Sequence, residues 1–181
     1  MGELKALLPW QGASLLEHQV EALQQGGAHL VVVVLGHRAD ELQPLLEGRE
    51  GVISALNPHY LQGKTTSIKI GVGAAAEHNP DALLLLNVDQ PRSAATIQFL
   101  LEAHQTGGAL ITLPTHGGKG GHPLVLDASL VDELLLVSEE TLGLREVLQR
   151  HRGQTRKVEV ERPEVLWDLN TPQQYRQALG G

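Results

Sequence analysis

Cysteine is absent from the 181 residues of the chain. This absence excludes disulfides, zinc–thiolate sites, iron–sulfur clusters and catalysis by a cysteine nucleophile. Aromatic residues make up only 3% of the chain, and the formal net charge of -7 comes with no basic patch interleaved with aromatics. Nucleic-acid binding needs clustered Lys and Arg and often stacking platforms, so no nucleic-acid partner is expected.

Long apolar runs are also missing. No apolar stretch approaches the roughly 18 residues of a membrane span, and no amino-terminal segment resembles a signal peptide. We therefore expect a cytoplasmic protein with no membrane partner. Hydrophobic residues, rich in Leu and Val, make up 41% of the chain, which is enough for the core of a single domain over residues 1–181.

Several catalytic motifs are absent as well. The nine histidines show no His-x-x-x-His spacing, which argues against zinc catalysis. There is no Gly-x-Ser-x-Gly elbow of an α/β hydrolase and no Gly-x-Gly-x-x-Gly turn of a dinucleotide oxidoreductase. Polar groups at strand ends and loops able to hold phosphate remain, and these suit phosphoryl or nucleotidyl transfer.

Residues 83–91, Leu-Leu-Leu-Leu-Asn-Val-Asp-Gln-Pro, carry the strongest structural signal. The four leucines predict a strand buried on both faces, as inside a parallel sheet. Pro91 cannot continue a central strand, so Asp89 lies just beyond its carboxyl end, where open α/β sheets bind ligands. A carboxylate there suits Mg²⁺, and the alternative is that Asp89 only caps the following helix.

Hydrophobic patterns and turn residues predict alternating strands and helices along the chain. Strands are expected at 29–35, 52–56, 83–86, 109–113 and 124–126, and a half-exposed strand of an antiparallel kind at 157–161. Helices are expected at 14–25, 39–47, 94–106, 128–136, 141–151 and 172–179, and one more follows residues 62–67 and runs through about Glu77. Ser14, Ser93 and Thr171 are the predicted N-caps. This order predicts a three-layer α/β/α domain with a mostly parallel sheet and a small antiparallel carboxyl-terminal part.

Two further segments could approach a ligand. Residues 62–67, Gln-Gly-Lys-Thr-Thr-Ser, could hold an anion on the free amides at a helix start, although their glycine spacing is not that of a Walker A motif. The alternative is that Thr66 or Ser67 is an ordinary N-cap. The glycine-dense loop 115–123 can bring backbone close to a ligand or simply be flexible.

Short motifs recur along nearly the whole chain. In chain order they are Met1-Gly2, Lys5, Leu8-Pro9, Gly12, Leu35-Gly36-His37, Asn57-Pro58, Gly63 with Ser67, Asp89-Gln90-Pro91, Gly121-His122-Pro123, Gly143 with Arg145, and Asn170-Thr171-Pro172. Together and in this order, they resemble the molybdenum-cofactor cytidylyltransferases, small NTP transferases that join a nucleotide to a phosphorylated pterin. The resemblance implies the Rossmann-like fold of the nucleotide-diphospho-sugar transferases.

The resemblance implies a role for each site residue. Lys5 and Asp89 would be catalytic, Lys5 by neutralising the triphosphate of the nucleotide and Asp89 by binding Mg²⁺. Asn170 would be the second metal ligand. The residues implied to line the nucleotide pocket with Lys5 are Asn57, Gly63 and Ser67, and those implied to bind the acceptor are Gln90, Pro91 and His122.

The implied reaction transfers CMP, or GMP, from CTP or GTP to a molybdopterin-type acceptor. A phosphate of the acceptor attacks the α-phosphorus in line, and pyrophosphate leaves. A molybdoenzyme or a chaperone is a candidate protein partner. Two alternatives stay open: a relative that binds nucleotide or cofactor without turnover, and an enzyme with another acceptor, such as a sugar phosphate, or a guanylyl donor.

The chain departs from the family pattern in two places. The family begins with a strand and a Gly-rich triphosphate loop that have no counterpart here, and one hypothesis is an internal start within a longer protein. Because that strand is central, we expect a gap, a rearranged sheet or an intermolecular pairing. The family's final Asp-Thr-Pro is Asn170-Thr171-Pro172 here, and an asparagine oxygen lacks charge, so metal affinity should fall, unless Asp168 substitutes.

Overall fold

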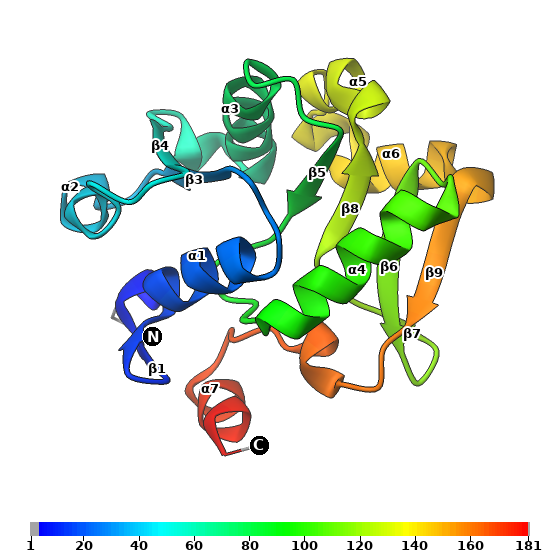
Figure 1. The fold of residues 1–181 in the computed structure, drawn as a ribbon. Coiled ribbons are helices and arrows are strands. Elements are labelled where there is room, and N and C mark those ends of the chain that lie inside the picture. The colour runs from blue at the N-terminus through cyan, green and yellow to red at the C-terminus, as the bar shows by residue number, and fades with distance from the viewer. Residues whose placement is uncertain (1–3, 181) are drawn as a thin grey trace.

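The computed structural model describes residues 4–180 as alternating strands and helices (Figure 1). The strands are β1 Pro9–Trp10, β2 Ala13–Ser14, β3 Val31–Leu35, β4 Val52–Leu56, β5 Ala82–Leu85, β6 Ile111–His116, β7 Lys119–Gly120, β8 Leu124–Asp127 and β9 Thr155–Glu159. The α-helices are α1 Leu15–Gln25, α2 Ala39–Leu42, α3 Lys64–Ala76, α4 Ala94–Gly107, α5 Val131–Leu135, α6 Leu144–Arg150 and α7 Pro172–Leu179. The Met1-Gly2 part of the family resemblance lies outside the described residues.

The main sheet is built on the strand order β5-β8-β6, with β7 and β9 both paired to β6. β8 runs antiparallel to both β5 and β6, so β5 and β6 share one direction, and β9 runs parallel to β6. The expected antiparallel strand at 157–161 is therefore wrong in its direction. α6 carries the chain across between β8 and β9, whereas the short connection through β7 forces β8 to reverse.

A second sheet pairs β3 with β4 in parallel, from Val31 opposite Val52 to Leu35 opposite Leu56. Within residues 4–180, β3 and β5 do not pair with each other. The sheet is thus divided, which agrees with the expected gap or rearranged sheet, and the expected alternative of an intermolecular pairing stays a prediction. A single domain over residues 1–181 stays a prediction.

The main sheet is covered on both faces, as the four-leucine run predicted. The expected place of this run inside a parallel sheet is wrong, because β5 ends the strand order and its described partner, β8, is antiparallel. Leu83 of β5 and Leu124 and Leu126 of β8 belong to a core with Leu134 of α5. Their neighbours in sequence, Leu84 and Val125, pack into a different core with Leu100 of α4. Successive side chains on a strand point to opposite faces, so the two cores lie on the two sides of the sheet. Figure 1 shows α4 crossing one side, with α5 and α6 behind.

Helix ends follow the predicted caps closely. Ser14 accepts a hydrogen bond from the Glu17 amide while the Glu17 carboxylate accepts from the Ser14 amide, which is the predicted capping box of α1. Ser93 caps α4 and Thr171 caps α7. The helix expected at 39–47 is shorter, because α2 passes into the 3₁₀ turn Gln43–Leu45.

The 3₁₀ turn Pro163–Leu166 precedes the segment that carries Asp168 and Asn170. The helix expected at 141–151 begins later than predicted. α6 begins only at Leu144, after Leu142 and Gly143 adopt positive φ. None of the helices in residues 4–180 has both the length and the apolar character needed to cross a membrane.

Candidate functional site

Asp89 lies in the loop between β5 and α4, as predicted from the strand that precedes it. The alternative, that Asp89 only caps the next helix, is wrong, because the N-cap of α4 is Ser93, which accepts from the Thr96 amide at 3.3 Å. The Asp89 carboxylate is free to face the segment before α7. A 2.8 Å hydrogen bond from the Leu169 amide to the Asp89 carbonyl holds that segment beside it.

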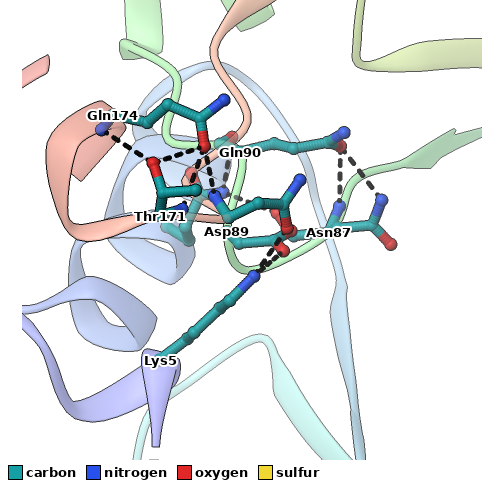
Figure 2. Close-up of polar contacts among 8 residues, drawn as sticks. Lys5, Asn87, Asp89, Gln90, Thr171 and Gln174 are labelled. Carbon is teal, nitrogen blue, oxygen red and sulfur yellow. Dashed lines mark hydrogen bonds and ion pairs between the residues drawn. The ribbon is translucent and has the colours of Figure 1, made fainter. Parts of the chain in front are cut away.

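Lys5 brings this site together from the other end of the chain. Its Nζ donates to Asp89 Oδ2 at 2.8 Å and to Asn170 Oδ1 at 2.8 Å (Figure 2). Lys5 comes from the 3₁₀ turn Lys5–Leu7, and Asn170 comes directly before the N-cap of α7. Three of the residues implied by the resemblance thus meet at one point, although 165 positions of sequence separate the outer two.

The arrangement suits a hard divalent cation. The ammonium of Lys5 lies between a carboxylate oxygen and an amide oxygen, which shows that a cation is accommodated between these two donors. Within residues 4–180, no group of three or more His, Cys, Asp or Glu side chains is arranged to hold a metal ion. Two protein oxygens, with other positions left to phosphate and water, match the way proteins hold Mg²⁺.

The loop that carries Asp89 is fixed by Gln19 of α1. Gln19 Nε2 donates to the carbonyls of Asn87 and Gln90, at 3.1 and 2.8 Å. Gln90 is buried, and its Oε1 accepts from Asn87 Nδ2 at 3.1 Å (Figure 2). Pro91 is also buried. The implied role of Gln90 and Pro91 in acceptor binding stays a prediction, since their side chains shape the loop in this structure.

Asn57 organises the start of α3. It is buried, and its Nδ2 donates to Thr66 Oγ1 and Ser67 Oγ, both at 2.9 Å. The residue at the N-cap position is Gly63, which makes no side-chain cap, so the interpretation of Thr66 or Ser67 as an ordinary N-cap is wrong. The structure therefore brings together the three residues implied to line a nucleotide pocket, and that role stays a prediction.

The free amides of α3 hold a carboxylate of the protein itself. The Thr65 amide donates to Glu139 Oε1 at 2.8 Å, and this hydrogen bond lowers the pKa of Glu139 below its ordinary value. A Cβ at Gly63 would lie only 2.5 Å from the Glu139 side chain, so a larger residue there would displace it. The start of α3 therefore binds an anion, the Glu139 carboxylate, as its free amides predicted.

His122 is half-buried in the loop before β8. Burial lowers the pKa of His122, and the positive charge of Arg92 lowers it further, while Asp168 and Asp89 act in the opposite direction. The imidazole is therefore neutral near neutral pH. Its side chain and those of Asp89 and Asp168 are close enough to influence one another electrostatically, and its implied role toward the acceptor stays a prediction.

Sequence reasoning did not identify Gln19 and Arg92, the two buried polar side chains that hold this loop. Arg92 directly follows the Asp89-Gln90-Pro91 segment, and this adjacency was the only signal available. Arginine is rarely buried completely, so the sequence predicts an exposed side chain at position 92.

Comparison with known proteins now decides the family. Residues 1–155 match the family model described as the MobA-like NTP transferase domain. The chain belongs to this family. The predicted enzyme class, nucleotidyltransferase, and the predicted fold class are confirmed.

Relatives with known names support this placement. The chain is 28% identical to the molybdenum cofactor cytidylyltransferase of Escherichia coli over 176 residues, which cover 97% of this chain and 86% of that one. It is 36% identical to the nicotine blue oxidoreductase of Paenarthrobacter nicotinovorans over 134 residues, which cover 70% of this chain and 63% of that one.

Solved structures show the same fold. A nucleotidyl transferase from Methanothermobacter thermautotroptrophicus superposes with a TM-score of 0.80 at 26% identity, covering 97% of this chain and 83% of that one. Rv0371c from Mycobacterium tuberculosis gives a TM-score of 0.82 at 20% identity, covering 100% and 92%. A manganese complex of Rv0371c gives 0.76 at 21% identity, covering 99% and 94%, and at these identities the likeness concerns the fold alone.

Proposed function

We propose that this nucleotidyltransferase moves the CMP moiety of CTP to a molybdopterin-type acceptor in the cytoplasm, with Mg²⁺ and release of pyrophosphate. The observation that carries the proposal is the meeting of Lys5, Asp89 and Asn170 at the end of a buried strand. The 28% identity with the Escherichia coli cytidylyltransferase along nearly the whole chain supports the choice of CTP and of the acceptor. GTP is the second candidate donor.

Asp89 and Asn170 would hold Mg²⁺, which when bound supplies neutralising charge to the phosphates of the nucleotide. Lys5 then turns its ammonium from these two oxygens to the triphosphate. In-line attack by an oxygen of the acceptor phosphate on the α-phosphorus forms the new P–O bond, and the bond to pyrophosphate breaks. The residues of the chain act here by positioning and charge, because this chemistry needs little else from a protein.

The two sides of the site differ in character. On the nucleotide side, Asn57 fixes the hydroxyls of Thr66 and Ser67 near Gly63, and the Glu139 side chain lies against Gly63 and would have to move before a phosphate could take its place. On the acceptor side, His122 is kept neutral by burial and by Arg92, so it offers a hydrogen bond rather than a charge. A candidate protein partner that accepts the product is a molybdoenzyme or its chaperone.

Calorimetry with CTP and GTP in Mg²⁺ tests this proposal. We expect CTP to bind more tightly than GTP, and pyrophosphate to be released when molybdopterin is added. Asp89→Ala should abolish the Mg²⁺-dependent part of CTP binding, whereas Asp132→Ala, which removes an exposed carboxylate on α5, should leave it unchanged. Equal Mg²⁺-dependent affinity in the Asp89 variant would remove this residue from its role.

A second candidate function is nucleotide or cofactor binding without turnover. The specific observation in its favour is that an uncharged Asn170 stands opposite Asp89, so that a single carboxylate faces the cation position. Binding of CTP with Mg²⁺ but no pyrophosphate release under any acceptor would support this candidate. Pyrophosphate release with molybdopterin would exclude it.

A further inference from the structure

Arg92 is the largest side chain that is completely buried in residues 4–180, with 1% of its surface exposed. Its guanidinium donates four hydrogen bonds, to the carbonyls of Pro91 at 2.8 Å, His122 at 2.8 Å, Val165 at 3.0 Å and Trp167 at 3.1 Å. All four acceptors are backbone oxygens. The fixed fork of the guanidinium can serve several acceptors at once, which an ammonium cannot do in the same geometry.

Burying the charged guanidinium of Arg92 costs desolvation free energy. Desolvation lowers the pKa of Arg92 to about 10, and the charges of Glu164, Asp168 and Asp89 oppose this shift. The group is therefore still charged at neutral pH. A buried charge is tolerated where it is hydrogen-bonded and compensated, and an apolar side chain of similar size would avoid the desolvation.

The four carbonyls belong to three segments that carry the site residues. Pro91 continues the Asp89 loop, His122 belongs to the loop before β8, and residues 165–167 lead to Asn170. The last two segments also contact each other closely: the His122 amide donates to the Val165 carbonyl at 2.9 Å, and a Cβ at Gly121 would lie only 2.2 Å from that oxygen. Arg92 is the side chain at which all three segments converge.

We propose that Arg92 is the positioning residue of the site: its four hydrogen bonds to backbone carbonyls hold the segment of Asn170 against the loop of Asp89, so that both oxygens reach one cation. Arg92 does not touch the substrate, and it acts through Asp89 and Asn170. The inference rests on the proposed function, since it concerns the same cation position.

Arg92→Lys tests the proposal with the charge unchanged. Because one ammonium cannot reach three segments, we expect the dissociation constant of Mn²⁺, used alone as the probe and followed by the paramagnetic resonance signal of the free ion, to rise about tenfold. The matched control is Arg156→Lys, which changes an exposed arginine that donates to the Ala103 carbonyl at 2.6 Å. We expect the control to bind Mn²⁺ as the unaltered protein does.

A double-mutant cycle with Asn170→Asp separates positioning from a general loss of structure. In the unaltered background, the added carboxylate should tighten Mn²⁺ binding about tenfold, because a charged oxygen replaces a neutral one. In the Arg92→Lys background, this gain should fall below about twofold, because residue 170 is no longer held against Asp89. An equal gain in both backgrounds would overturn the inference.

The outcomes distinguish this inference from the proposed function. If neither Asn170→Asp nor Asp89→Ala changes Mn²⁺ affinity, the cation site itself is wrong. If both change it and the cycle is additive, only the role of Arg92 is wrong. Should Arg92→Lys fail to fold, amide hydrogen exchange in the unaltered protein decides: slow exchange at His122 and Leu169 supports a rigid frame, and exchange as fast as in an unstructured peptide refutes it.

Discussion

Replacing Lys5 by methionine should change the binding of the metal and of the nucleotide in opposite directions. In the structure, Lys5 Nζ lies 2.8 Å from both Asp89 Oδ2 and Asn170 Oδ1, so the ammonium occupies the position between the two proposed metal ligands. A divalent ion must displace the ammonium before it can bind both oxygens. Methionine keeps much of the length and apolar character of the side chain and removes the competing cation.

Two contributions set the expected change in the free energy of Mn²⁺ binding. The ion pair is partly exposed, with 30% of the Lys5 and 19% of the Asp89 side chain accessible, so breaking it costs about 0.5 kcal/mol. An ammonium displaced to about 6 Å from a divalent ion would repel it by about 1.4 kcal/mol in water, which salt halves to about 0.7 kcal/mol. The sum, about 1.2 kcal/mol, predicts that Lys5→Met binds Mn²⁺ alone between about fivefold and tenfold more tightly.

The nucleotide should respond in the opposite direction. A charge-assisted hydrogen bond from Lys5 to the triphosphate contributes about 1.5 to 3 kcal/mol, so Lys5→Met should bind CTP with Mg²⁺ between about tenfold and a hundredfold more weakly. Electron paramagnetic resonance measures free Mn²⁺, and calorimetry measures CTP. Lys119→Met, on the exposed strand β7, serves as the control, and neither affinity should change in it.

Either of two results for Lys5→Met would refute the expected competition between Lys5 and the metal. If Lys5→Met weakens Mn²⁺ binding in the absence of nucleotide, the ammonium supports the site rather than competing for it. An unchanged affinity for Mn²⁺ would show that the ion binds elsewhere. In either case the pairing of Lys5 with Asp89 would be structural, and the proposed exchange of one cation for another would fail.

The remaining predictions concern stability. Ser14→Ala removes the capping box at the start of α1 and should lower the free energy of unfolding by about 1 kcal/mol in urea titrations. Leu134→Ala opens a cavity in the core of α5 and should lower it by about 3 kcal/mol, without changing Mn²⁺ affinity. His104 is buried beside Thr112, and burial lowers its pKa below 6.5 in the folded state, so the unfolded state binds more protons below that pH. The free energy of unfolding should therefore fall as the pH is lowered from about 7 to about 5, and it should fall less in His104→Gln. A fall of the same size in His104→Gln would show that His104 is not the group responsible.

Local signals in the sequence were reliable where the chemistry is local. The hydroxyls of Ser14, Ser93 and Thr171 cap the helices that they were predicted to cap, because a cap depends on amides only two or three residues away. The leucine run was correctly expected to pack on both sides of the sheet, since Leu83 contacts one core and Leu84 the other. The parallel partners expected for it were wrong, because β5 pairs with the antiparallel β8.

Predictions that depend on partners far along the chain were weaker. The alternation at 157–161 indicates a half-exposed strand, but the same alternation fits either direction, and only the path through α6 makes β9 parallel to β6. Thr66 and Ser67 have the residue type of an N-cap, but their hydroxyl oxygens accept hydrogen bonds from Asn57 Nδ2 instead. The N-cap residue of α3 is Gly63.

The sequence by itself determined the alternation of strands and helices, the family, and the residues Lys5, Asp89 and Asn170 as a candidate site. These depend on residue type and on order along the chain. Only the tertiary structure decided that Lys5 lies between the two oxygens, that Glu139 binds the start of α3, and that Arg92 is buried as a charged link between three segments. The physical reason is that desolvation and hydrogen bonding depend on which distant backbone atoms surround a side chain, and no local pattern records those neighbours.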